Sequence, residues 1–156
     1  MEEIKCPNND LKTSVIYPIY LVSKEIIRKY NVLLSEYDIT YTQYLVMNYF
    51  FHEKKSNLKK IGKSLMLDSS TLTPLLKKLE KKGFIVREKS TVDERNLFIS
   101  VTDEGLALKP KLKKVRKEIQ KICDLSEDEV NSIHTIMFKL LNTIIKENEN
   151  GNRKSK

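Results

Sequence analysis

The chain has 156 residues, of which 40% are hydrophobic and 32% are charged, with only 4 Gly and 4 Pro. This length suits a single domain over residues 1–156, and this composition excludes a disordered or collagen-like chain and favours long helices. The 29 Lys and Arg residues outnumber the 21 Asp and Glu residues, and the resulting net charge of +8 indicates a polyanionic partner.

Targeting and redox signals are sparse. There is no uncharged apolar run of about 18 residues, as a membrane span needs, and the acidic Glu2 and Glu3 are unlike a basic secretory signal. Cys6 and Cys123 lie far apart without a pairing pattern, which is typical of a reducing compartment. We therefore expect a cytoplasmic protein with no membrane contact and no disulfide framework.

The N-terminal part predicts two helices. Apolar residues recur in steps of three and four from Ile19 to Tyr37, which predicts a long helix over about 13–36. Pro18 removes a backbone donor near its start, so we expect a kink or a later start there. After a break, Thr40 can cap a second, largely buried helix rich in aromatic side chains.

Two short helices joined by a tight turn follow. Residues 58–65 have the spacing of a short amphipathic helix with its lysines facing out. After a turn-and-cap signal at Asp68 to Ser70, a second helix runs to Gly83, which suits a left-handed C-cap. The apolar side of this second helix is a leucine stripe, made of Leu72, Leu75, Leu76 and Leu79. The pair is a candidate helix-turn-helix.

A β-hairpin is expected next, because residues 84–87 and 97–101 have strand character and flank a charged loop over 88–96. Helix, turn, helix and then a two-stranded hairpin is the element order of a winged helix. The predicted fold class is therefore mainly α with a small β-hairpin: a winged helix-turn-helix with long N- and C-terminal helices.

Two further helices close the chain. Thr102 caps a helix that we expect to run to about 122, with Pro110 near its second turn, and Ser126 with Glu129 forms a capping box. That box opens a final helix to about 147, followed by a polar tail. The first helix and these two carry apolar residues on more than one stripe, Leu112 and Ile119 among them, so we expect a partner subunit.

The excess charge is concentrated in the helix-turn-helix and hairpin. Residues 54–100 hold twelve Lys or Arg and five Asp or Glu, which accounts for seven of the eight excess positive charges. A solvated helix face is the ordinary explanation of a lysine run. Its coincidence with a winged helix favours DNA instead, because the second helix of such a motif enters the major groove and the hairpin reaches the minor groove.

The second helix of the motif offers small hydrogen-bonding side chains early and lysines late. Short donors can approach base edges and phosphates, and lysines neutralise backbone charge. Ser69 has the simpler alternative role of an N-cap, which would also direct backbone N–H groups at a phosphate. Pro74 is expected on an exposed early turn, where its ring can contact a thymine methyl or a sugar.

A family resemblance rests on two stretches, DITYTQYLVM (38–47) and LDSSTLTPLLKKLEKKGFIVREKSTVDERNLFISVTDEG (67–105). With the flanking long helices, they resemble the MarR family of winged-helix regulators over about 11–147. The most specific element is Asp93-x-Arg95 in the loop, followed by a strand and by Thr-x-x-Gly from residue 102.

The resemblance implies a homodimer on a pseudo-palindromic operator in double-stranded DNA, with residues 11–37 and 104–147 as dimerisation helices and 38–103 as the DNA-binding region. It implies that Arg95 enters the minor groove and that Asp93 holds it by a salt bridge; a narrow groove concentrates negative potential. The expected DNA-binding residues are Ser69, Ser70, Thr71, Thr73, Pro74, Lys77, Lys78, Lys89, Asp93 and Arg95.

The likeness is closest to the organic-hydroperoxide-sensing, OhrR-like branch, yet the reactive cysteine of that branch falls on Ile16. The tyrosines that surround that cysteine are present as Tyr20, Tyr30 and Tyr41, which can equally be core residues. We therefore expect a repressor released by a small aromatic or phenolic effector bound near these tyrosines. A thiol-based peroxide sensor using Cys6 is the alternative.

Other functions lack a sequence signal. His52 and His134 have no acidic or cysteine neighbours at metal-ligand spacing, and no nucleophile elbow or Gly-rich phosphate loop occurs. We expect no enzyme activity, no metal and no cofactor. A winged helix used for protein contacts without inducer control remains an alternative, against which Lys77, Lys78 and Arg95 argue.

Overall fold

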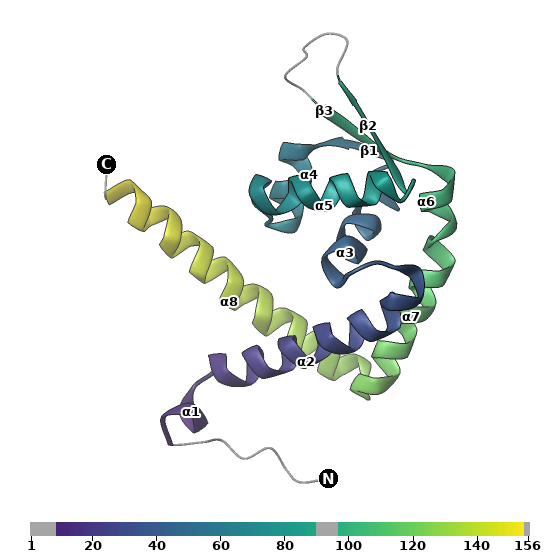
Figure 1. Cartoon of the computed structure of the whole chain (residues 1–156). Coiled ribbons are helices and arrows are strands. Elements are labelled where there is room, and N and C mark those ends of the chain that lie inside the picture. The colour runs from purple at the N-terminus through teal and green to yellow at the C-terminus, as the bar shows by residue number, and fades with distance from the viewer. Residues whose placement is uncertain (1–8, 90–96, 155–156) are drawn as a thin grey trace. The chain divides into compact units, whose positions relative to one another are not determined.

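The computed structural model describes residues 9–89 and 97–154 (Figure 1). The chain divides into a first compact unit that ends at Ile119 and a second that begins at Gln120. Among the described residues, no helix has the length and apolarity needed to cross a membrane. The elements are α1 (Asn9–Thr13), α2 (Ile16–Leu34), the 3-10 turn η1 (Ser35–Tyr37), α3 (Tyr41–Phe50), β1 (Lys55–Asn57), α4 (Leu58–Leu65), α5 (Ser69–Lys81), β2 (Ile85–Lys89), β3 (Leu97–Val101), α6 (Asp103–Ala107), α7 (Lys109–Cys123) and α8 (Glu127–Lys154).

The predicted first helix is divided. The chain breaks after Thr13, and α2 starts at Ile16, which makes Pro18 its third residue. A proline is tolerated there because the first N–H groups of a helix have no intrahelical acceptor. The predicted Thr40 cap is confirmed as a capping box: Gln43 N donates to Thr40 Oγ1 at 3.4 Å, and Thr40 N donates to Gln43 Oε1 at 3.0 Å.

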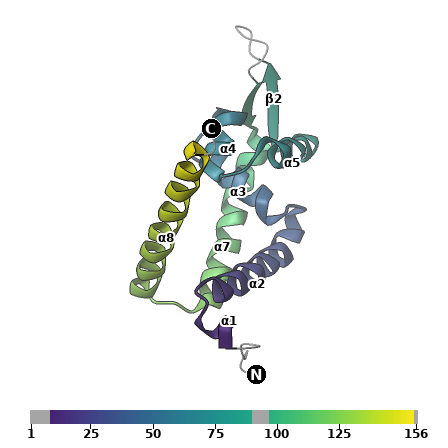
Figure 2. The same cartoon turned by 90° about the vertical axis from the view of Figure 1, so that its left-hand side faces the viewer.

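The described strands form one antiparallel sheet in the order β1-β3-β2, with α4 and α5 at the base of the hairpin (Figure 2). Strands β2 and β3 pair from Ile85 opposite Val101 to Lys89 opposite Leu97. The hairpin is as predicted, except that β2 extends into the expected loop. Sequence reasoning missed a third strand: Lys55–Asn57 pairs with the other edge of β3.

The core of the first unit lies where the leucine stripe meets α3, α4 and the sheet. Leu72 and Leu79 are fully buried, and Leu75 and Leu76 nearly so. Their neighbours in the core include Phe50, Ile61 and Ile99. Because the stripe supplies one side of this core, the opposite side of α5 is left for solvent.

The single helix predicted from Thr102 to about 122 is wrong. Leu108 separates α6 from α7, and Pro110 is the second residue of α7. In a continuous helix, the proline would lose its hydrogen bond and its ring would meet the carbonyl of Leu106. Leu112 and Ile119 are buried within this chain, so they do not form a face for a partner.

The capping box that opens the last helix is confirmed. Ser126 N donates to Glu129 Oε2 at 2.9 Å, and Glu129 N donates to Ser126 Oγ at 3.4 Å. This hydrogen bonding also lowers the pKa of Glu129. The predicted end near 147 is too early, since α8 runs to Lys154. Extending an existing helix by one residue is far easier than nucleating a new one, which allows the polar segment to continue it.

Two glycines give a matched test of the fold. A Cβ on Gly105 would overlap Phe84 O and lie 2.8 Å from Val101 Cγ2, whereas one on Gly83, with φ +75°, would meet nothing within 4 Å. We expect Gly105→Ala to lower the free energy of unfolding by about 3 kcal/mol, because packed backbone must shift. Gly83→Ala should lose only about 1 kcal/mol from its backbone conformation. Urea denaturation measures both, and equal losses would contradict this packing.

Candidate nucleic-acid interface

The exposed side of α5 gathers most of the residues expected to contact DNA. Ser69, Ser70, Thr71, Pro74, Lys77 and Lys78 are exposed, and Thr73 is half-buried. Residues at spacings of four, three and four lie on one line of a helix. The line opposite the leucine stripe, which we call the α5 ridge, consists of Ser70, Pro74, Lys77 and the exposed Lys81.

The N-terminal turn of α5 is organised by Asp68, which corrects the idea that Ser69 is the cap. Asp68 has the extended φ of −71° and ψ of 162° of an N-cap, and Ser69 is the first helical residue. Thr71 N donates to Asp68 Oδ1 at 2.7 Å, Thr71 Oγ1 donates to Oδ2 at 3.2 Å, and Ser70 Oγ donates to Oδ1. Both hydroxyls therefore present oxygen lone pairs, as acceptors, to an incoming ligand.

These hydrogen bonds change the acidity of the cap. They hold the pKa of Asp68 below its ordinary value, with the Ser70 hydroxyl as the largest contribution. Its carboxylate is exposed, so it stays charged beside the surface that DNA would approach. The charge also suits the positive end of the helix dipole, which stabilises α5 where it begins.

Three of the expected DNA-binding residues belong to the wing, which consists of the strands β2 and β3 and the loop between them. Lys89 is the last residue of β2, and Asp93 and Arg95 lie outside the described residues. The paired strands β2 and β3 lead directly to the segment that holds Asp93 and Arg95.

An ion pair between α5 and the hairpin was missed by sequence reasoning. Arg87 on β2 donates from Nε to Glu80 Oε2 at 2.7 Å, and its second nitrogen lies 2.6 Å from the same oxygen. The side chains of Arg87 and Glu80 are only 20% and 35% exposed, so solvent screens this pair less than a fully exposed one. It ties the last turns of α5 to the wing strand.

Lysines on α4 extend the positive surface past the start of α5. Lys59 and Lys63 are exposed and, with Ser69, line a cavity of about 480 Å³ between α4 and α5. Lys60 instead pairs with Glu53 at 2.7 Å, which raises the pKa of Lys60. Two of the three α4 lysines are therefore available to neutralise a phosphate near the N-terminal end of α5.

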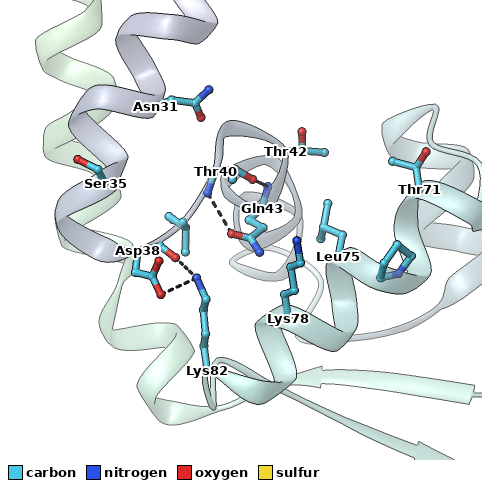
Figure 3. A pocket seen from close by; sticks show the side chains of 12 residues that line it. Asn31, Ser35, Asp38, Thr40, Thr42, Gln43, Thr71, Leu75, Lys78 and Lys82 are labelled. Carbon is cyan, nitrogen blue, oxygen red and sulfur yellow. Dashed lines mark hydrogen bonds and ion pairs between the residues drawn. The ribbon is translucent and has the colours of Figure 1, made fainter.

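A larger cavity of about 710 Å³ lies on the other side of α5, between that helix, the end of α2 and the start of α3 (Figure 3). Asn31 of α2 and Ser35 of η1 line one side of it, and Thr71 and Lys78 line it from α5. The ion pair between Lys82 and Asp38 closes one end of it.

The tyrosines expected near an effector do not all meet. Tyr30 and Tyr41 lie 4.9 Å apart between ring centroids, and Tyr44 joins them at 5.3 Å from Tyr30. Tyr20 is 55% exposed. Burial, reinforced by Tyr44, raises the pKa of Tyr30 and Tyr41 above the usual value of a phenol, which keeps both hydroxyls neutral. These rings pack against the core.

Within the described ranges, no group of three acidic, His or Cys residues could hold a metal ion.

The described elements form a helix-turn-helix followed by an antiparallel hairpin. The exposed face of the second helix carries lysines and small polar side chains. This combination defines a winged helix-turn-helix regulator. Comparison with known proteins agrees. The family model described as Transcriptional regulator SarA/Rot matches residues 28–112. The chain belongs to the SarA/Rot family of transcriptional regulators.

Curated relatives cover most of the chain. It is 45% identical over 126 residues to the HTH-type transcriptional regulator SarZ of Staphylococcus aureus strain USA300, covering 81% of this chain and 85% of the relative. The SarZ of Staphylococcus haemolyticus strain JCSC1435 is 42% identical over 123 residues, covering 79% and 84%.

Solved structures confirm the predicted MarR-like winged helix. Reduced AbfR bound to DNA superposes with a TM-score of 0.74 at 32% identity, covering 87% of this chain and 95% of AbfR. The Staphylococcus aureus MepR–DNA complex gives a TM-score of 0.75 at 25% identity, covering 83% and 98%. A mutant of Escherichia coli MarR complexed with operator DNA gives 0.69 at 26% identity, covering 79% and 90%.

The Asp68 cap predicts a pH dependence of stability. A carboxylate whose pKa falls on folding stabilises the native state above its unfolded pKa, and that contribution is lost as the pH falls through the folded pKa. Asn also caps helices but carries no charge. We therefore expect the free energy of unfolding of the parent protein to be higher than that of Asp68→Asn near neutral pH. The difference between the two free energies should shrink below about pH 4. Urea titrations at several pH values measure it; a pH-independent difference would contradict the role of the charge.

Proposed function

We propose that this regulator binds double-stranded DNA sequence-specifically, as a homodimer on a pseudo-palindromic operator, and acts as a repressor released by a small ligand. The α5 ridge carries the proposal. It combines a hydroxyl, an apolar ring and lysines on the exposed side of a helix whose other side is fixed in the core. A major groove admits one such helix.

The contacts divide by chemistry. At the start of α5, Ser70 and Thr71 accept hydrogen bonds from base-edge amino groups, because their hydroxyl protons are donated to Asp68. Ser69 faces base edges and the adjoining phosphates, with Thr73 beside it, and the Pro74 ring contacts a thymine methyl or a sugar. Lys77 and Lys78, further along, neutralise phosphates, which supplies affinity more than specificity. In the wing, Arg95 inserts into the minor groove, Asp93 orients it, and Lys89 lies against the backbone.

Exposed apolar side chains support a homodimer. On α2, Tyr20 and Val32 are 55% and 63% exposed, and on α8, Ile136 and Phe138 are 58% and 51% exposed. Each helix, taken by itself, therefore carries apolar surface that its own unit does not cover. Contiguous apolar surface on a soluble protein marks an interaction site, and a second copy supplies a matching surface by symmetry.

Catalysis has no part in the proposal. Its support is membership of a family of transcriptional regulators together with a binding surface on α5 that consists of hydroxyls, a proline ring and lysines. A regulator that binds chromosomal DNA works in the cytoplasm of a bacterium. The alternative of a winged helix that contacts proteins predicts no salt-dependent affinity for duplex DNA.

Release by a ligand is favoured over release by oxidation. AbfR is known in reduced, overoxidized and disulfide forms. In this chain, Ile16 stands at the position expected for the reactive cysteine and is the first residue of α2. Tyr30 and Tyr41 lie together, with their ring centroids 4.9 Å apart, and are the residues proposed to contact an aromatic or phenolic effector. Cys6, the alternative sensor, lies outside the described residues.

Substitutions of the basic residues test DNA binding. Arg95→Ala should weaken operator binding by about 1–3 kcal/mol and reduce its salt dependence, with the fold intact. Lys77→Ala should weaken specific and non-specific duplexes more evenly, because a phosphate contact carries no sequence information. The matched control is Lys114→Ala, at an exposed lysine on α7, whose apolar side is buried within this chain.

Fluorescence anisotropy over a salt series measures these affinities, on a duplex selected from a random pool by the parent protein. Binding by Arg95→Ala that matches the parent would contradict the minor-groove role. A parent that selects no duplex, or whose affinity ignores salt, would contradict DNA binding itself.

Peroxide treatment tests the mode of release. A thiol switch needs a thiolate whose oxidation disturbs the DNA-binding form, and Ile16 has no such chemistry. We expect stoichiometric cumene hydroperoxide to leave DNA binding unchanged in the parent and in Cys6→Ser, as measured by gel shift. Release by peroxide that disappears in Cys6→Ser would overturn the ligand-gated proposal in favour of Cys6.

A further inference from the structure

The C-terminal end of the recognition helix α5 is tied to the corner between α2 and α3 by one lysine. Lys82 Nζ lies 2.9 Å from Asp38 Oδ2 and also donates a hydrogen bond to the backbone carbonyl of Asp38 (Figure 3). The Lys82 side chain is only 24% exposed, although that of Asp38 is 90% exposed. The Lys82 ammonium group therefore contacts both the carboxylate and the backbone carbonyl of Asp38, which is 44 residues away in sequence.

The corner that receives Lys82 has a defined backbone. Asp38 adopts φ 51° and ψ 40°, in the left-handed region, and its N–H donates to Ser35 O at 3.0 Å. The next residue, Ile39, is buried, and Thr40 then caps α3. Because Asp38 is bound to Ser35 on one side and followed by two fixed residues on the other, its backbone carbonyl is held in place with respect to α2 and α3.

An open cavity lies between α5 and the end of α2 on this side. The cavity of about 710 Å³ separates them, with Asn31 and Ser35 on the α2 side and Pro74 and Lys78 on the α5 side. Figure 3 shows Asn31, Ser35 and Lys78 around an open space that Lys82 crosses at one end. The Lys82–Asp38 ion pair therefore links α5 to the α2–α3 corner directly, across one end of this cavity.

The same end of α5 has a second charged link in another direction. Glu80 binds Arg87 of β2 at 2.6 Å, two residues before Lys82. One pair fixes α5 against the wing strand and the other fixes it against the α2–α3 corner. Together with burial of the leucine stripe, these two ion pairs set the orientation of α5, and so the direction in which the α5 ridge faces.

We propose that Lys82 and Asp38 are positioning residues, which set the orientation of the recognition helix relative to α2 and thereby the half-site spacing that the dimer accepts. The inference rests on the proposed function, since α2 is assigned there to the dimer interface. Two recognition helices read one operator only when their separation matches its half-sites. A looser link widens the range of separations and weakens binding to the best one.

The competing explanation is that Lys82 is one more lysine that contacts a phosphate. The two explanations differ for Asp38→Asn, which removes a negative charge beside the DNA-binding surface. A phosphate role predicts unchanged or tighter binding to all duplexes, because the protein becomes more positive. A positioning role predicts weaker binding to a two-half-site operator alone.

The experiment measures the affinity for DNA by fluorescence anisotropy. The duplexes are the selected operator, a duplex with one half-site, and operators with one or two base pairs inserted or removed between the half-sites. Asp38→Asn and Lys82→Gln should each lose about tenfold on the operator, and the double variant no more than either alone, as for partners in one interaction. Lys82→Arg should retain parental binding. Asp38→Asn should bind the single half-site as the parent does, and its preference among spacings should flatten.

The matched control is Glu36→Gln, which removes a neighbouring charge of the same sign. Lys81→Gln serves as the comparison for a lost phosphate contact on the α5 ridge and should weaken the single half-site and the operator alike. Thermal unfolding of each variant separates loss of binding from loss of fold. If the parent binds duplex and Asp38→Asn binds the operator as tightly or more tightly, the positioning role is wrong. It is equally wrong if Asp38→Asn weakens the single half-site and the operator alike. A parent that binds no duplex instead contradicts the proposed function.

Discussion

Burial of the leucine stripe is the interaction on which the rest of the structure depends. Leu72, Leu76 and Leu79 fill the centre of the core that α3, α4 and the sheet share. Each fully buried leucine contributes about 1.5–3 kcal/mol. Since only one side of a helix can be buried in this way, the same burial leaves the α5 ridge in solvent, where a groove of DNA can receive it.

Ion pairs then limit the rotation and tilt of α5 that apolar burial alone allows. A stripe of leucines holds a helix against its core but tolerates some rotation and tilt, because apolar contacts are not directional. Directional links near the end of α5 limit that freedom. Glu80 binds Arg87 of the wing strand, and Lys82 binds the α2–α3 corner. The basic surface is therefore presented in one orientation.

Local sequence signals predicted much of this fold. The Thr40 and Ser126 caps, the leucine stripe and the strands of the hairpin depend on residues close in sequence, and the structure confirms them. Tertiary pairing was not predictable. Strand β1 has no apolar alternation and exists through backbone bonds to the distant β3. The Lys82–Asp38 link joins residues 44 apart, and nothing near either residue marks the other.

The central claim is that two copies of this chain place their α5 helices in successive major grooves of one operator. A hydroxyl-radical footprint on a duplex selected by the parent protein tests it most directly. The account predicts two protected segments related by a pseudo-two-fold axis, with centres about 10–10.5 base pairs apart or a multiple of that. A single asymmetric protected segment, or none at low salt, would contradict it.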